Sequence, residues 1–196
     1  MDIADTREQD KVCIEAFLGG DISSFDRLVL RYKDKVFNLC FRLLGDYEEA
    51  NDCGQEIFVK VYRSLNNFKF NSSFSTWLYT ITVNHCKNRL RSLQYRFWKK
   101  VLPFDPVKKD DNPENYYEIE DPSPSPFTQM ADREKEAILQ QAINALPQGA
   151  RAIVILRDME GLPYEEIARI TGYNPGTVKS KLARARQLLR EQLKGS

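Results

Sequence analysis

Cations, amides and hydroxyls gather in one short segment near the C-terminus, NPGTVKSKLARARQLL, at residues 174–189. Residues 174–196 contain six Lys or Arg side chains and a single acidic one. Such groups donate hydrogen bonds to phosphate oxygens and to base edges, so the chemistry that they suit is nucleic-acid binding. The alternative is an ordinary basic surface helix, and the flanking residues must decide between the two.

The residue types that most often perform catalysis are sparse. The chain has one histidine, His85, and four cysteines without a CxxC pair, Cys13, Cys40, Cys53 and Cys86. No arrangement of Cys, His and acid suggests a nucleophile with its base, and no spacing suggests a metal site. We expect buried, thiol-form cysteines. We also expect no metal or other cofactor and no enzymatic activity.

The overall net charge of +1 conceals an uneven distribution along the 196 residues. Residues 84–100 carry six Lys or Arg and no acid, whereas residues 105–125 carry seven Asp or Glu against two Lys. No apolar run is long enough to cross a membrane. The acidic start, MDIADTREQD, does not have the pattern of a secretory signal, so we expect a cytoplasmic protein without membrane insertion.

The elements that position these side chains are helices. Apolar residues recur every three or four positions and period-two alternation is absent, which predicts an all-α protein. One helix is expected to end at Gly45, and the next to begin after Asp46, whose side chain can cap it. A polar, aromatic loop at residues 66–75 precedes a third helix at residues 76–100, which begins apolar and ends basic.

An acidic, proline-rich stretch divides these helices from a second group. Residues 103–127 contain six prolines, and each proline inside a helix costs about 3 kcal/mol. We therefore expect a linker at residues 99–130, between a helical domain at residues 21–98 and a smaller one at residues 131–196. Residues 1–20 are expected to form an N-terminal extension with a first helix.

Residues 163–189 have the features of two short helices joined by a tight turn. Pro163 suits the first position of one helix, and Gly172 suits the left-handed turn that ends it. Asn174 is a good N-cap for the second helix, with Pro175 at its first position. A helix-turn-helix also needs a small residue, a turn glycine and an apolar plug, which here are Ala168, Gly172 and Val178.

The second helix of this motif has an apolar and a polar face. Its inward stripe, at steps of four, three and four residues, consists of Val178, Leu182, Ala185 and Leu189. The polar face suits the major groove of DNA, and its candidate contacts are Thr177, Lys179, Ser180, Ala183, Arg184 and Gln187. Lys181 and Arg186 lie at its flanks, where they can reach phosphates.

Three stretches, in this order, resemble the extracytoplasmic-function sigma factors of bacterial RNA polymerase. They are DYEEANDCGQEIFVKVYRSL, FNSSFSTWLYTITVNHCKNRLR and LPYEEIARITGYNPGTVKSKLARAR. The resemblance runs from about Asp21 to the C-terminus. It implies a region 2 bundle and a region 4 helix-turn-helix. It also implies a protein that binds core polymerase, recognises the −35 and −10 promoter elements and assists in promoter melting.

The resemblance assigns the polymerase-binding surface to the second helix of region 2. There the family holds the clamp helices of the largest polymerase subunit, and the matching residues are Asp52, Gln55, Glu56, Val59 and Arg63. An ordinary amphipathic surface helix is the alternative.

The aromatic loop and the helix after it match the family's reader of the single-stranded −10 element. Exposed aromatic rings can stack on unpaired bases, and the candidates are Phe68, Phe70 and Phe74. The resemblance favours Asn71 and Asn84 for contact with a flipped base and Lys87 and Arg91 for phosphates. Trp77 has a spacing equally compatible with base contact and with the core. The resemblance assigns recognition of the −35 element to the helix at residues 175–189.

Some positions depart from the family pattern. Cys53 and Gly54 stand where the family usually has leucine and a bulkier residue, Phe70 where glycine is common, and Pro163 where a serine cap is usual. The resemblance also implies an anti-sigma factor as a partner. A polymerase-independent helix-turn-helix regulator is the alternative function. Such a regulator would usually bind paired half-sites as a dimer, and no heptad seam for dimerisation is apparent.

Overall fold

The computed structural model describes the backbone of residues 3–101 and 126–194, and the side chains of residues 6–94 and 135–194. These residues form helices and no strand, so the predicted all-α fold is confirmed. The elements are α1 (Ile3–Leu18), α2 (Ser23–Leu44), α3 (Tyr47–Ser64), the 3-10 helix η1 (Leu65–Asn67), α4 (Phe74–Val101), α5 (Pro126–Asn144), α6 (Gln148–Val154), the π-helical turn η2 (Ile155–Met159), α7 (Tyr164–Thr171) and α8 (Pro175–Lys194).

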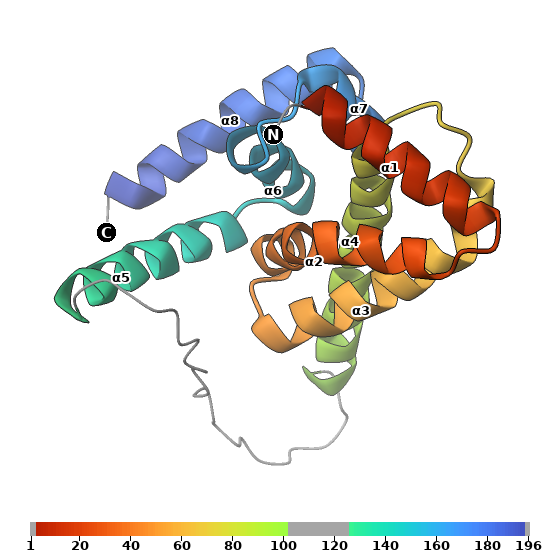
Figure 1. Cartoon of the computed structure of the whole chain (residues 1–196). Coiled ribbons are helices and arrows are strands. Elements are labelled where there is room, and N and C mark those ends of the chain that lie inside the picture. Colours follow the sequence, from red (N-terminus) through yellow and green to blue (C-terminus); the bar gives the residue numbers. More distant parts are fainter. Residues whose placement is uncertain (1–2, 102–125, 195–196) are drawn as a thin grey trace.

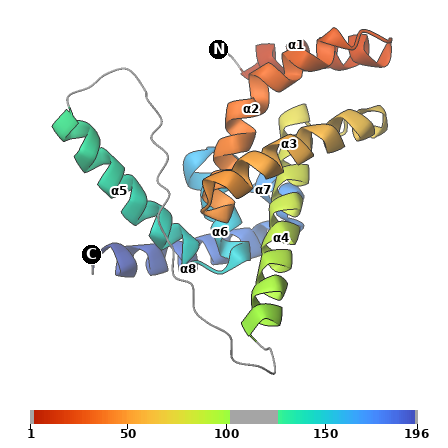
Figure 2. The ribbon, with the colours of Figure 1, turned by 90° about the horizontal axis from the view of Figure 1, so that it is seen from below.

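The N-terminal half is a bundle built on a hairpin of α2 and α3. Gly45 ends α2 with φ of 76°, and its N–H donates to the Phe41 carbonyl at 2.8 Å. The Asp46 carboxylate then accepts from the Glu49 N–H at 2.8 Å and caps α3. Both helix ends therefore lie where the sequence predicts. α1 and α4 pack against this hairpin, as Figure 2 shows.

Apolar side chains spaced by three or four residues fill this bundle. On α2 the buried row includes Leu28, Tyr32, Val36 and Leu39, and on α3 it includes Ile57 and Val61. All four cysteines are free and buried, as the sequence predicts. α1 is attached through Asp10, whose carboxylate accepts from the Tyr32 hydroxyl and pairs with Arg31.

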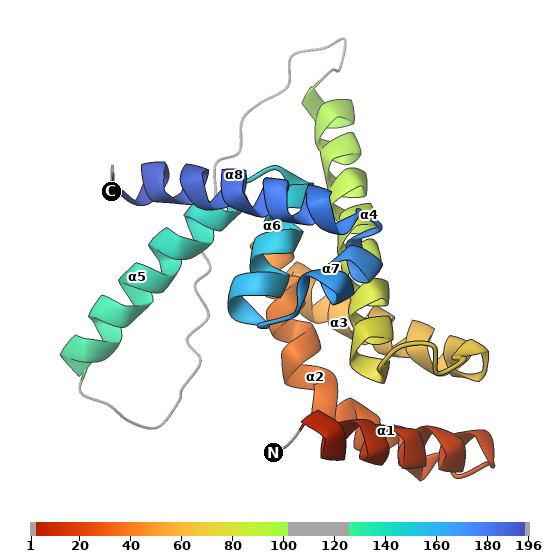
Figure 3. The same ribbon diagram turned by 90° about the horizontal axis from the view of Figure 1, so that it is seen from above.

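The C-terminal half contains α5 to α8. α8 lies across α5 and α6, and α7 precedes it through a tight turn (Figure 3). Helix extends into both ends of the stretch assigned to the linker, because α4 runs to Val101 and α5 begins at Pro126. Proline is well tolerated at a first helical position, since its missing N–H would have no partner there. The acidic residues 102–125 lie outside the described part.

The two halves pack against each other and share one continuous core. α7 lies along α4, and α5 and α6 contact the C-terminal part of α2 (Figure 1). The sequence left this arrangement open, because helical periodicity identifies a buried face without identifying what covers it.

Candidate nucleic-acid interface

The turn between α7 and α8 has the geometry of a helix-turn-helix. Gly172 has φ of 73°, and its N–H donates to the Ala168 carbonyl at 2.9 Å. The Asn174 side chain accepts from the Thr177 N–H at 2.7 Å and so caps α8, which starts at Pro175. One detail of the prediction is wrong: Pro163 is the extended residue before α7, and Tyr164 is its first helical residue.

The α8 helix buries the predicted stripe and leaves the predicted reading face outside. Val178 and Ala185 have no exposed surface, Leu182 is 2% exposed, and Leu189 packs against the same core. We call the outward residues the α8 face. They are all exposed and consist of Lys179, Ser180, Ala183, Arg184 and Gln187. Donors and small side chains thus occur together on one side of a rigid helix, which is a geometry that fits a major groove.

The flanking candidates have partners within the protein. Arg186 forms a two-pronged ion pair with Asp158, with Nε and Oδ2 3.1 Å apart, and this raises the pKa of Arg186. Lys181 is half-buried, and its Nζ lies 5.0 Å from the centre of the Tyr173 ring. Thr177 is also half-buried. The sequence did not indicate Asp158 or Tyr173 as partners.

The candidate polymerase surface is the outer side of α3. Asp52, Gln55, Glu56, Val59 and Arg63 are all exposed there. The placement of this set on one exposed helix face matches the expectation, although polymerase contact itself stays a prediction.

The acids at the edge of this surface lie close to α4. Arg89 pairs with Glu49 and lies 3.8 Å from Glu56, while His85 Nε2 lies 3.0 Å from a Glu56 carboxylate oxygen. The hydrogen bond to Glu49 raises the pKa of Arg89. These contacts join the candidate polymerase surface to the basic half of α4.

Two predictions for the aromatic loop and the first residue of α4 are wrong. Phe68 is 7% exposed and Phe74 is 3% exposed, so neither ring is available to stack on a base. Phe74 lies edge-on to Tyr32, and Phe68 lies 5.2 Å from the Trp77 ring. The short loop brings these rings to the junction of α1, α2 and α4, where burial removes apolar surface from water. Trp77 is half-buried and packs against the core.

Phe70 and Asn71 remain as exposed residues of this loop. Phe70 is 43% exposed and has φ of 56°, the left-handed conformation in which glycine is preferred. That conformation costs a side-chain-bearing residue about 1–2 kcal/mol. The ring centres of Phe70 and Phe68 lie 4.8 Å apart, and this contact offsets part of the cost. The loop therefore keeps a glycine-like backbone and presents one aromatic ring.

The α4 helix presents its polar candidates on one face toward the other half of the protein. Asn84, Lys87 and Arg91 are exposed, and they line a cleft opposite Thr171 and Tyr173 of the helix-turn-helix. We call these three residues the α4 face. The sequence named these three residues as candidates for DNA contact, but it did not indicate that they share one face or what lies opposite.

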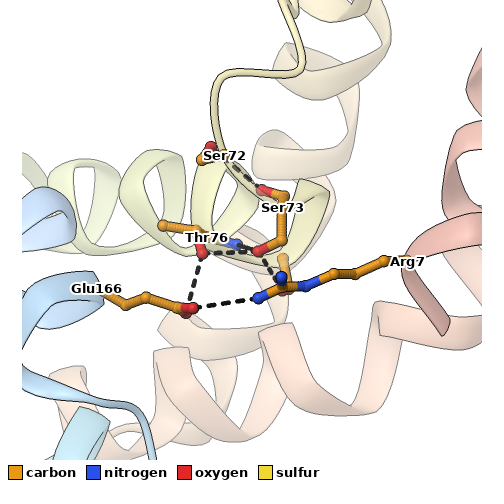
Figure 4. A network of polar contacts seen from close by, with 6 residues as sticks. Arg7, Ser72, Ser73, Thr76 and Glu166 are labelled. Atoms are coloured by element: carbon orange, nitrogen blue, oxygen red, sulfur yellow. Dashed lines mark hydrogen bonds and ion pairs between the residues drawn. The ribbon is translucent and has the colours of Figure 1, made fainter. Parts of the chain in front are cut away.

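A polar network fixes α7 against α4. Figure 4 shows Glu166 of α7 between two partners: it accepts from the Thr76 hydroxyl at 3.0 Å and pairs with Arg7 at 3.3 Å. Nearby, the Tyr79 hydroxyl donates to Glu160 at 2.8 Å. Burial, together with the charge on Glu160, raises the pKa of Tyr79. None of these inter-half contacts was predicted, because their partners are far apart in the chain.

A second set of contacts covers the C-terminal end of α2. Arg151 of α6 donates to the Leu43 carbonyl at 2.7 Å, and Gln140 of α5 donates to the Arg42 carbonyl at 3.2 Å. The last carbonyls of a helix have no partner within the helix, so these side chains satisfy them. A Cβ added to Gly45 would overlap the Asn144 amide, which shows how closely α5 approaches.

Within residues 3–101 and 126–194, no helix combines the length and apolar character needed to span a membrane.

Comparison with protein families finds two matching models. Sigma-70 region 2 matches residues 28–96, and Sigma-70, region 4 matches residues 136–189. The RNA polymerase sigma-H factor of Pseudomonas aeruginosa is 39% identical over 188 residues, which cover 96% of this chain and 95% of that protein. The ECF RNA polymerase sigma-E factor of Escherichia coli K12 is 35% identical over 180 residues, 92% of each chain.

Two solved structures share the fold. The sigma factor RpoE, in complex with the anti-sigma factor NepR from Bartonella quintana, aligns with a TM-score of 0.67 at 24% identity, over 88% of this chain and 98% of that one. CnrH, in complex with the cytosolic domain of CnrY, aligns with a TM-score of 0.69 at 19% identity, over 96% of this chain and 99% of that one. At these identities the likeness shows the fold, and it extends over both halves.

Proposed function

The chain belongs to the ECF family of RNA polymerase sigma factors, and from this premise we propose that it binds core RNA polymerase and directs initiation at specific promoters. The observation that carries the proposal is the α8 face, which a helix-turn-helix of regular geometry presents to solvent. Its cations, amide and small side chains read the duplex −35 element in the major groove. Lys181, Arg186 and Thr177 support this contact at its edges.

The −10 element is bound as a single strand by the aromatic loop and α4. Phe70 stacks on a base, Asn71 and Asn84 hydrogen-bond to base edges, and Lys87 and Arg91 contact phosphates. Flipping one base out of the duplex costs a few kcal/mol, and stacking and hydrogen bonding offset this cost. Phe68 and Phe74 act as core residues that hold the loop in place.

Core polymerase is bound by the exposed side of α3. Asp52 and Glu56 supply negative charge there, and Val59, 49% exposed, supplies an apolar contact. The protein performs no chemistry: binding energy opens the promoter, and the polymerase makes RNA. Polymerase binding and promoter opening take place in the cytoplasm.

The packed arrangement of the two halves is proposed to open when polymerase binds. The α4 face looks across a cleft to the helix-turn-helix turn, so a DNA strand and the C-terminal half compete for the same space. The polar contacts between α7 and α4 are partly exposed and contribute modestly to stability. The halves also share an apolar core, so polymerase has to favour the separated state by more than the polar contacts and this core together contribute.

An anti-sigma factor is proposed as a regulator. RpoE of Bartonella quintana, which shares this fold, was solved in complex with the anti-sigma factor NepR. CnrH, which also shares the fold, was solved in complex with the cytosolic domain of CnrY. A protein that co-purifies with this chain and blocks its transcription activity would be the expected finding.

Run-off transcription with purified core polymerase tests the proposed function. A transcript that requires both this protein and a cognate promoter is the expected result. Transcription that is independent of the protein would contradict it. Specific duplex binding by a dimer of the protein alone would instead favour a polymerase-independent regulator.

A further inference from the structure

The cleft between the two halves is built from both of them. It has a volume of about 270 Å³. One wall is the α4 face, and the opposite wall comes from α6 and the helix-turn-helix through Gln148, Arg151, Thr171 and Tyr173. Apolar side chains such as Leu43, Val83 and Leu90 complete the lining. A ligand in this cleft would therefore touch both halves at once.

Among the residues whose side chains the structure describes, the cleft is lined by three cations and by no acidic residue. They are Lys87, Arg91 and Arg151, and no described carboxylate forms an ion pair with any of them. The two α4 cations are exposed and lie four residues apart on one helical face. The positive charge of the cleft is thus uncompensated within the described part of the chain.

Arg151 makes this excess of charge significant, because its side chain is only 8% exposed. Its guanidinium donates to the backbone carbonyls of Leu43, Asn144 and Leu146, while its Nε has no hydrogen-bond partner. Burial lowers the pKa of Arg151. Carbonyl groups satisfy hydrogen bonds but do not neutralise a charge, and a buried charge is unfavourable unless it is paired. An anion in the cleft would provide the missing pairing.

We infer that this cleft binds a small phosphate-bearing anion, of nucleotide size or smaller, that holds the two halves together. Phosphate fits the lining because guanidinium groups bind its oxygens in pairs and an ammonium adds a point charge. The side-chain amide groups of Asn84 and Gln148 supply neutral donors. The apolar wall accommodates the carbon skeleton of a phosphorylated metabolite, whereas inorganic phosphate uses the cations alone.

Binding of such an anion has a direct consequence for promoter opening. It covers the α4 face, which is the face proposed to hold the −10 strand, and it leaves the α8 face exposed. A ligand that binds only the packed state stabilises that state by an amount that grows with the logarithm of the ligand concentration above its Kd. The anion is therefore an inhibitor of −10 binding that leaves −35 binding unchanged.

Thermal unfolding of the full chain tests the site with three probes: inorganic phosphate, pyrophosphate and ADP. Sodium chloride keeps the ionic strength constant. A saturable rise in Tm is expected, with shifts of the Gly149 and Thr171 amide resonances, because both residues line the cleft. A larger effect of ADP identifies a metabolite as the ligand class, and equal effects of ADP and inorganic phosphate identify phosphate alone.

The decisive variant is Lys87→Gln/Arg91→Gln, which changes only exposed side chains and so leaves folding intact. It should weaken binding at least tenfold, whereas the control Lys33→Gln, an exposed cation outside the cleft lining, should not. Arg151→Gln should also weaken binding, with circular dichroism to verify that it folds. No saturable shift with any probe, or equal shifts in the double variant and the control, would overturn the proposal.

Discussion

The α8 face and the α4 face have similar compositions but different surroundings. Each combines cations with an amide at helical spacing. The α8 face is exposed along its length, whereas the α4 face lies opposite the helix-turn-helix across a cleft. Composition alone does not determine whether a DNA-binding surface is available, because the packing of the other half decides what lies in front of it.

This difference separates the two promoter contacts. Under the proposed function, duplex −35 binding through α8 needs no rearrangement of the halves. The proposed binding of the −10 strand through α4 needs the C-terminal half to move, since Thr171 and Tyr173 lie across the cleft from the α4 face. A change in the packing of the halves should therefore affect −10 binding and spare −35 binding.

The largest effect on stability is expected at the aromatic loop. Phe68→Ala should destabilise the fold by about 3–5 kcal/mol, because it leaves a cavity among buried rings. Phe70→Ala should change stability little but weaken binding of a single-stranded −10 oligonucleotide by about 1–3 kcal/mol. Urea unfolding and fluorescence anisotropy measure the two quantities. Equal destabilisation by both changes would contradict the assignment of Phe68 to the core.

The α8 face is tested by Arg184→Ala. Loss of an exposed guanidinium from the reading face should weaken −35 duplex binding by about 1–3 kcal/mol and reduce discrimination between sequences. Arg190→Ala is the control, because Arg190 is exposed on the same helix outside the α8 face and donates to the Arg186 carbonyl. Electrophoretic mobility shifts with cognate and scrambled duplexes give the comparison. Identical, sequence-independent losses would show that Arg184 contacts only phosphate.

The docking of α7 on α4 is tested by Glu166→Ala. Removal of this carboxylate breaks its contacts with Thr76 and Arg7 and should favour the separated halves by about 1 kcal/mol. Binding of the −10 strand should rise about fivefold, and −35 binding should not change. Small-angle scattering reports the accompanying rise in radius of gyration. Glu165→Ala is the matched control on the exposed side of α7, and a response equal to that of Glu166→Ala would exclude a specific docking role.

Two glycines with similar backbones provide the last comparison. Gly45 and Gly172 both end helices, with φ of 76° and 73°. Alanine at either position should cost about 1–2 kcal/mol for the left-handed conformation. Gly45→Ala should cost more, because its Cβ overlaps Asn144 of α5, while no atom lies within 4 Å of the corresponding Cβ at Gly172. Denaturant unfolding gives both values. A greater loss at Gly172 would contradict the close approach of α5 to α2.

The sequence by itself determined the local structure and the composition of each face. Gly45, Asp46, Gly172 and Asn174 end or begin helices as predicted, because each acts through hydrogen bonds to backbone groups within a few residues. The buried stripe of α8 follows from helical periodicity in the same way. These features depend on neighbours in the chain, and a pattern of residue types is enough to find them.

Only the tertiary structure decided which side chains are available. It buried Phe68 and Phe74, paired Arg186 with Asp158 across 28 positions, and joined Thr76 to Glu166 across 90. It also left Arg151 buried beside the α4 face, without a counter-charge among the described side chains. Such contacts depend on how helices distant in sequence pack. Helical periodicity specifies that a face is buried, but the shape and charge of the opposing surface determine which element covers it.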